Sequence, residues 1–184
     1  MKITKLFLDT EFTGLHQRTT LISIGLVTEH GDSFYAELID YDKDQLDDWL
    51  QTNIIDNLSL GHFQDNQISH DGNHIKLKSD KPALRKHLEM WLGSLGPVEV
   101  WSDCLAYDWV LFNDIFGHAF NIPKNVLYIP YDLSTLLRIY GYDSDISRIE
   151  FSESNEVRHN ALGDAITIKL CFEKIMRIKA ENFY

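Results

Sequence analysis

Two carboxylates end an apolar run near the N-terminus of the chain. Asp9 and Glu11 follow Leu6-Phe7-Leu8, a run that is typical of a buried strand. Side chains alternate along a strand, so residues two apart point to the same side. Two carboxylates on one side of a strand end are suited to hold a hard cation such as Mg²⁺ or Mn²⁺. On its own, however, the Asp-x-Glu pattern more often marks exposed carboxylates than a metal site.

Three further residues of suitable chemistry lie far along the chain. Asp108 falls at or near the start of a predicted amphipathic helix, where N-capping is its ordinary role. Asp164 falls in the first turns of the last predicted helix, among apolar residues that should pack on a sheet, so its carboxylate needs a partner. His159 precedes Asp164 by five residues, which on a regular helix would place the two side chains about 140° apart. Both face one site only if His159 precedes the regular helix; alone, it would be a surface or capping histidine.

The hydrophobic pattern predicts the elements that would position these residues. Strands are predicted at residues 3–9, 20–28, 33–39, 98–102 and 126–129, the second and third forming an antiparallel hairpin. Helices are predicted to start near Trp49 and to cover residues 81–95, 106–116, 132–141 and about 160–180. Residues 57–79 are polar and are interpreted as an irregular insertion loop, a lid or a partner contact, and residues 142–157 as another loop. We therefore expect one α/β domain over residues 1–184, with a mixed five-stranded sheet and helices on both faces.

Composition and charge limit the class of function. A formal net charge of −11 argues against a broad basic face for duplex DNA, but it is compatible with a nuclease whose acidic site carries its own divalent ions. Cys104 and Cys171 are far apart and are predicted to be buried thiols in a reducing compartment. His62, His70 and His74 leave a zinc site open as a weaker alternative, since no cysteines accompany them. No apolar run is long enough for a signal peptide or a membrane span, which predicts a cytoplasmic protein.

Taken in order, the motifs resemble those of the DEDDh 3′–5′ exonucleases of the RNase H-like superfamily, which include polymerase proofreading subunits, RNase T and oligoribonuclease. Residues 9–15 (DTEFTGL) are similar to the first family motif, Tyr107-Asp108 with Trp101 upstream to the second, residues 159–165 (HNALGDA) to the third, and residues 131–137 to the segment between the last two. Residues 103–108 lack the His-Asn-Ala lead-in of the better-known members. This departure and the 57–79 insertion are more similar to the compact bacterial and phage exoribonuclease branch.

The resemblance implies a metal-dependent 3′–5′ exoribonuclease. Its metal ligands would be Asp9, Glu11, Asp108 and Asp164, holding two Mg²⁺ or Mn²⁺ ions about 3.5–4 Å apart, with Asp9 bridging both. One ion would make a water more acidic and the other would stabilise the departing 3′-oxygen. His159 would be the general base for that water. The products would be nucleoside 5′-monophosphates.

The resemblance also implies where the RNA would lie. The residues predicted to contact it are Phe12, Thr13, Gly14, Leu15, Tyr107, Trp109 and Arg158. The first four would form the floor for the 3′-terminal nucleotide. Tyr107 and Trp109 could stack on bases, with core packing as an equal alternative. Arg158 could meet a phosphate, with a surface ion pair as an equal alternative.

The acidic net charge argues against processive binding of a long nucleic acid. It favours short single-stranded RNA or RNA 3′ overhangs as substrates, with DNA as an open alternative. Three rivals stay open: an exodeoxyribonuclease of the proofreading kind, a non-catalytic nucleic-acid-binding module, and a structural domain that contacts a partner through residues 57–79. A homodimer, formed through that segment or through exposed aromatic residues such as Trp49, is a further expectation.

Overall fold

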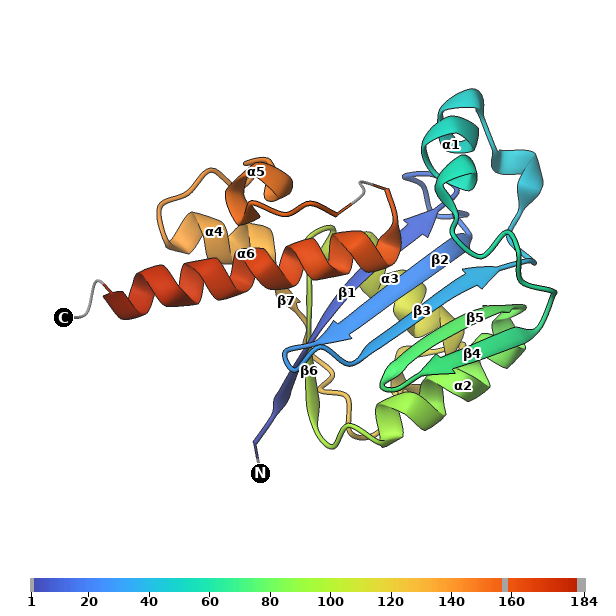
Figure 1. Cartoon of the computed structure of the whole chain (residues 1–184), viewed down its shortest axis with the longest axis horizontal. Coiled ribbons are helices and arrows are strands. Elements are labelled where there is room, and N and C mark those ends of the chain that lie inside the picture. The colour runs from blue at the N-terminus through green and yellow to red at the C-terminus, as the bar shows by residue number, and fades with distance from the viewer. Residues whose placement is uncertain (1, 157–158, 182–184) are drawn as a thin grey trace.

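A computed structural model describes residues 2–156 and 159–181, whose strands form one mixed sheet in the order β4-β5-β3-β2-β1-β6-β7 (Figure 1). The strands are β1 (Thr4–Phe12), β2 (Leu21–Thr28), β3 (Ser33–Leu38), β4 (Gln67–Asp71), β5 (His74–Ser79), β6 (Val98–Ser102) and β7 (Tyr131–Asp132). The α-helices are α1 (Asp48–Asn53), α2 (Lys81–Gly93), α3 (Leu105–Ile115), α4 (Leu133–Ile139), α5 (Arg148–Ser152) and α6 (Ala161–Glu181). Short 3₁₀ turns are η1 (Lys43–Gln45), η2 (Ile55–Asn57) and η3 (Ala119–Asn121).

Strand β1 runs through the middle of the sheet, antiparallel to β2 and parallel to β6. Side-chain alternation divides its apolar residues between two cores. Leu8 packs in the core beneath α2 and α3, whereas Phe7 packs in the core beneath α4, α5 and α6. Every residue of β2 is buried because helices cover both faces of the sheet there. The α/β class, the helices on both faces and the β2–β3 hairpin expected from the sequence are confirmed.

Residues 57–79 are not an irregular loop. Their second half is a hairpin of β4 and β5, and β5 adds to β3 in parallel, so the sheet has seven strands instead of the five expected. Ile75 and Leu77 alternate with polar residues, and Gly72 at φ +57° makes the tight turn between the strands. The polar residues face solvent on an edge hairpin, which is why composition alone suggested a loop.

Three smaller expectations are also wrong. The strand predicted at residues 126–129 is reduced to a single bridge between Val98 and Val126, and the edge strand is β7 instead. The loop predicted at residues 142–157 contains α5, which is too short to show a helical repeat. Cys104 is exposed because it lies in the turn before α3, whereas Cys171 is buried as expected.

Helix α6 lies across the face of β1 and β2 (Figure 1). Gly25 of β2, which pairs with Asp9, permits this approach: a Cβ atom on Gly25 would lie 2.2 Å from the Ala161 carbonyl oxygen. The first turn of α6 therefore sits directly over the carboxylate end of β1. Within the described part of the chain, no helix is both long and apolar enough to cross a membrane.

Candidate active site

The carboxylates of β1 lie on the α6 side of the sheet. Phe7 packs beneath α6, and Asp9 and Glu11 follow it at every second position. Glu11 is only 9% exposed. The pairing register with β2 shifts between Glu11 and Phe12, so the strand becomes irregular directly after its second carboxylate.

The start of α6 brings a histidine and a third carboxylate to the same place. The Asn160 side chain caps the helix by accepting from the Gly163 N–H at 3.2 Å. His159 precedes the helix with a left-handed φ of +59°, and its N–H donates to Asp164 Oδ2 at 2.9 Å. The expectation that His159 lies before the regular helix is confirmed.

Glu11, His159 and Asp164 each offer a ligand atom, and these atoms lie within 4.8 Å of one another. Among the residues that the structure describes, this is the group with the composition and spacing of a metal site. It does not include His62, His70 or His74, so the zinc alternative finds no support there.

Charge and burial show that this end of β1 is suited to a cation. Burial, followed by the charges of Asp164 and Asp108, raises the pKa of Glu11 to about 8. Burial also raises the pKa of Asp9 well above its usual range, assisted first by Asp108 and then by Glu11 and Asp164. A divalent cation would offset this repulsion, and carboxylate oxygens are the ligands that Mg²⁺ and Mn²⁺ prefer.

Asp108 is fully buried and reaches β1 from the α3 side. Its Oδ1 accepts from the Thr10 hydroxyl at 2.6 Å, and its Oδ2 accepts from the Ser102 hydroxyl. Burial raises the pKa of Asp108 to about 6, although the hydrogen bonds from both hydroxyls oppose the rise. The structure thus couples Asp108 electrostatically to Asp9 but does not place it in the three-residue group above.

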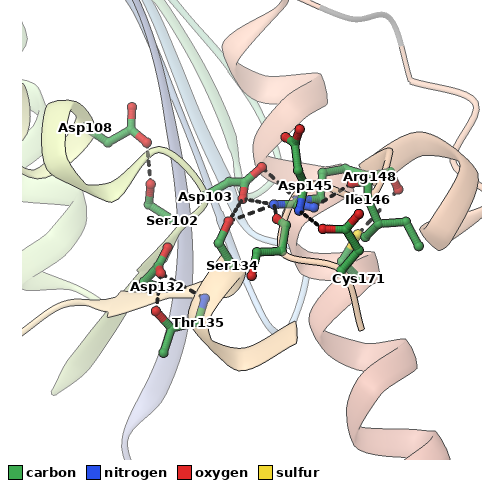
Figure 2. A network of polar contacts seen from close by, with 12 residues as sticks. Ser102, Asp103, Asp108, Asp132, Ser134, Thr135, Asp145, Ile146, Arg148 and Cys171 are labelled. Carbon is green, nitrogen blue, oxygen red and sulfur yellow. Dashed lines mark hydrogen bonds and ion pairs between the residues drawn. The ribbon is translucent and has the colours of Figure 1, made fainter. Parts of the chain in front are cut away.

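A further carboxylate, Asp103, lies in the turn between β6 and α3 (Figure 2). Its charge contributes to the raised pKa values of Asp9 and Asp108. Arg148 of α5 pairs with both oxygens of Asp103, at 2.9 Å from Nε to Oδ2 and 2.7 Å from Nη2 to Oδ1. Ser134 of α4 donates to the same carboxylate at 3.0 Å. Sequence reasoning missed this cluster.

Two of the residues predicted to contact the substrate lie together, and a third is accessible. The rings of Phe12 and Tyr107 stack with centroids 5.3 Å apart and planes 15° apart. Leu15, which follows Phe12 closely in the chain, has a side chain that is 73% exposed. Beside Tyr107 lies an open groove of about 760 Å³. Its lining includes Asp103, Cys104, Ala106, Tyr107, Trp109 and Pro130.

The other predicted contacts have more structural roles. Thr13 is buried, and its hydroxyl donates to Gln45 Oε1 at 2.6 Å. Gly14 leaves room for the His16 ring, which would lie 2.9 Å from an added Cβ atom. Trp109 stacks on Phe112 at 5.3 Å and packs against the core, although it also lines the groove. Arg158 lies outside the described residues.

Comparisons with known proteins agree on the family. The family model described as "3'-5' exoribonuclease Rv2179c-like domain" matches residues 4–176. Two Mycobacterium tuberculosis proteins, from strains CDC 1551 and H37Rv, are each named 3'-5' exoribonuclease and are 29% identical over 122 residues. That match covers 65% of this chain and 66% of the relatives, slightly less than two thirds of their length.

Two solved structures are similar in fold. The Neurospora crassa Pan2 catalytic unit, which contains a protease and a nuclease domain, matches with a TM-score of 0.57 and 17% identity, over 97% of this chain and 28% of that one. The metal-free E. coli ExoI–ssDNA complex matches with a TM-score of 0.58 and 10% identity, over 98% of this chain and 41% of that one. At these identities the likeness concerns the fold alone, and the α/β fold expected from the sequence is confirmed.

Proposed function

Because the chain belongs to the 3′–5′ exoribonuclease Rv2179c-like domain family, we propose that it removes nucleotides from RNA 3′ ends and releases nucleoside 5′-monophosphates. The observation that carries this proposal is the meeting of Glu11, His159 and Asp164 within 4.8 Å at the end of β1. A histidine beside carboxylates provides a base and cation ligands in one place, which is what hydrolysis of a phosphodiester requires.

We further propose that Asp9, Glu11, Asp108 and Asp164 hold two Mg²⁺ or Mn²⁺ ions. When bound, such ions make a water more acidic and neutralise charge on the departing 3′-oxygen. The raised pKa values of Asp9 and Glu11 support the proposal, because carboxylates forced together need either protons or cations. Thr10 and Ser102 orient Asp108, and the His159 N–H orients Asp164.

His159 would accept the proton of the attacking water. Its position ahead of α6 lets the imidazole face Glu11 and Asp164 without belonging to the helix. A positioned general base of this kind contributes about 10²–10⁴-fold to a rate.

The 3′-terminal nucleotide would rest beside the Phe12–Tyr107 pair, with Leu15 against its base. Because Thr13 is buried and Gly14 has no side chain, their contacts would come from the main chain. Single-stranded RNA and RNA 3′ overhangs are the proposed substrates. DNA is the alternative, because one fold neighbour is a complex with single-stranded DNA. A homodimer and a cytoplasmic location also remain proposals.

The deciding experiment compares 5′-labelled RNA and DNA oligonucleotides of matched sequence, with Mn²⁺ or Mg²⁺ and with a chelator. We expect stepwise shortening of RNA from its 3′ end, with 5′-monophosphates identified by chromatography. His159→Ala should lower the rate about 10²–10⁴-fold. Equal rates on RNA and DNA would remove the RNA preference, and undiminished hydrolysis in the chelator would overturn the proposed metal site.

A further inference from the structure

Trp49 of α1 lies outside the residues assigned to the candidate active site, and core packing does not explain it, because its side chain is 54% exposed. The helix is anchored by other residues. Asp47 caps it by accepting from the Leu50 N–H at 2.7 Å, and buried Leu50 and Ile54 pack against Ile22 of β2. Helix α1 is therefore a fixed support that carries Trp49 on its outer side.

The indole of Trp49 meets the imidazole of His159. The two ring centroids are 5.3 Å apart and the ring planes cross at 78°, the edge-to-face arrangement that aromatic pairs favour. Among the residues that the structure describes, Trp49 is the aromatic residue whose ring contacts the imidazole of His159.

His159 needs such a contact because its main-chain restraint does not reach its ring. It precedes α6 with φ +59°, and the hydrogen bond from its N–H to Asp164 fixes the backbone at 2.9 Å. Two side-chain torsions remain between that backbone and the imidazole. A neighbouring ring on a separate, anchored helix limits those torsions.

We propose that Trp49 is a positioning residue that holds the imidazole of His159 towards Glu11 and Asp164. On this proposal Trp49 does not act on the reacting atoms itself but acts through His159. Its effect on rate rests on the proposed exonuclease function, whereas the contact itself can be tested without catalysis.

The kinetic test is a double-mutant cycle on RNA hydrolysis. Trp49→Ala should lower kcat about tenfold with little change in KM, because part of the contribution of a positioned base is lost. Trp49→Phe, which keeps an aromatic edge, should restore most of the rate. In the His159→Ala background, Trp49→Ala should have no further effect, since the two residues act as one unit. An unchanged kcat in Trp49→Ala, or an equal loss in both backgrounds, would overturn the proposal.

Phe120→Ala is the matched control, because it also removes an exposed aromatic side chain, 81% accessible on η3. It should leave kcat unchanged. Melting temperatures of all variants should agree closely, which separates positioning from loss of folding.

The independent test uses NMR of the metal-free protein. The imidazole resonances of His159, assigned by their loss in His159→Gln, should move towards those of an unrestrained histidine in Trp49→Leu. Resonances that stay in place would contradict the contact. A wild-type protein that is inactive on RNA would count against the proposed function, while this measurement would still decide the role of Trp49.

Discussion

At the residue scale, the fully buried Asp108 carboxylate leads to a prediction about pH. Its pKa is raised to about 6 by burial, and the Ser102 hydroxyl is the first of the hydrogen bonds that oppose the rise. Ser102→Ala removes stabilisation from the ionised form, so the pKa should rise further. If catalysis needs ionised Asp108, the acid limb of the kcat/KM–pH profile of Ser102→Ala should move to higher pH by on the order of one pH unit.

The control is Ser94→Ala, which removes a hydroxyl that donates to the Trp91 carbonyl at the end of α2. This variant should keep the wild-type profile. An acid limb that does not move in Ser102→Ala would show that Asp108 does not set it.

Single residues also show which contacts of the site could not be predicted from the sequence. Asp9 and Glu11, or His159 and Asp164, are close in the chain, so alternation and helical geometry could relate their directions. The partners of Asp108 could not be found in this way. Thr10 is 98 residues from Asp108, and only the packing of α3 against β1 joins them.

The Asp103–Arg148 pair is the second interaction of this kind. It spans 45 residues and leaves no local pattern in either segment.

At the scale of elements, the approach of α6 to β2 depends on a residue without a side chain. A Cβ on Gly25 would lie 2.2 Å from the Ala161 oxygen and 2.3 Å from the Leu162 nitrogen, which are both main-chain atoms. Gly25→Ala should therefore lower the free energy of unfolding by about 3 kcal/mol. It should also weaken Mn²⁺ binding, because a displaced α6 would move Asp164, and His159 just ahead of the helix, away from β1.

Urea denaturation and Mn²⁺ titration measure these two effects. Gly93→Ala in α2 is the control, since its Cβ would meet nothing within 4 Å. That change should be neutral or stabilising by up to about 1 kcal/mol. Near-wild-type stability and Mn²⁺ affinity in Gly25→Ala would refute the close-packing argument.

Arg148 ties three segments together, which predicts a stability effect at the same scale. Besides Asp103 and Ser134, it donates to the Ile146 carbonyl (Figure 2). It also donates to the Ser144 carbonyl. Arg148→Met leaves Asp103 unpaired in a site where it is 26% exposed, so unfolding should become easier by about 2 kcal/mol, less than for a fully buried pair.

The double variant Arg148→Met with Asp103→Asn should recover part of that loss, because no unpaired charge remains. Arg85→Met breaks the exposed pair with Glu89 and should cost about 0.5 kcal/mol or less. Chemical denaturation measures the free energy of unfolding of each variant. An equal loss in Arg148→Met and Arg85→Met would contradict the prediction that the Arg148 pair contributes more.

The elements that the sequence predicted best have long apolar repeats and contribute to one or both of the two cores. Strands β1 and β2 and helices α2 and α6 are of this kind. Edge elements were missed because they bury little: β4 and β5 show few apolar residues, and α5 has five residues. Their positions depend on the partner that they pack against, which a local pattern does not contain.

At the scale of the whole molecule, an acidic chain gathers several carboxylates at one end of its central strand. The net charge of −11 makes this arrangement unfavourable unless protons or cations compensate it. Folding and metal binding should consequently depend on pH together.

Glu11 fixes the direction of that dependence. Its pKa is about 8 in the fold against a usual value of 4.5, so the folded state binds the proton more tightly than the unfolded chain does. The stability it contributes is fully present below pH 4.5 and is lost as pH rises through about 8. Metal-free protein should accordingly melt at a lower temperature at pH 8 than at pH 6, and Glu11→Gln should reduce this difference.

Cations take the place of the lost protons, so the stabilisation by Mn²⁺ should grow over the same pH window. At a concentration of about 100 times Kd, a ligand adds about 2.7 kcal/mol, equivalent to roughly 5–10 °C in Tm for a domain of this size. At pH 6 the same concentration must displace protons from Glu11, and the gain should be smaller. Thermal melts with Mn²⁺ and with chelator at both pH values measure the two gains. Equal gains at pH 6 and pH 8 would mean that the ion does not bind at Glu11, and the four-carboxylate site would have to be abandoned.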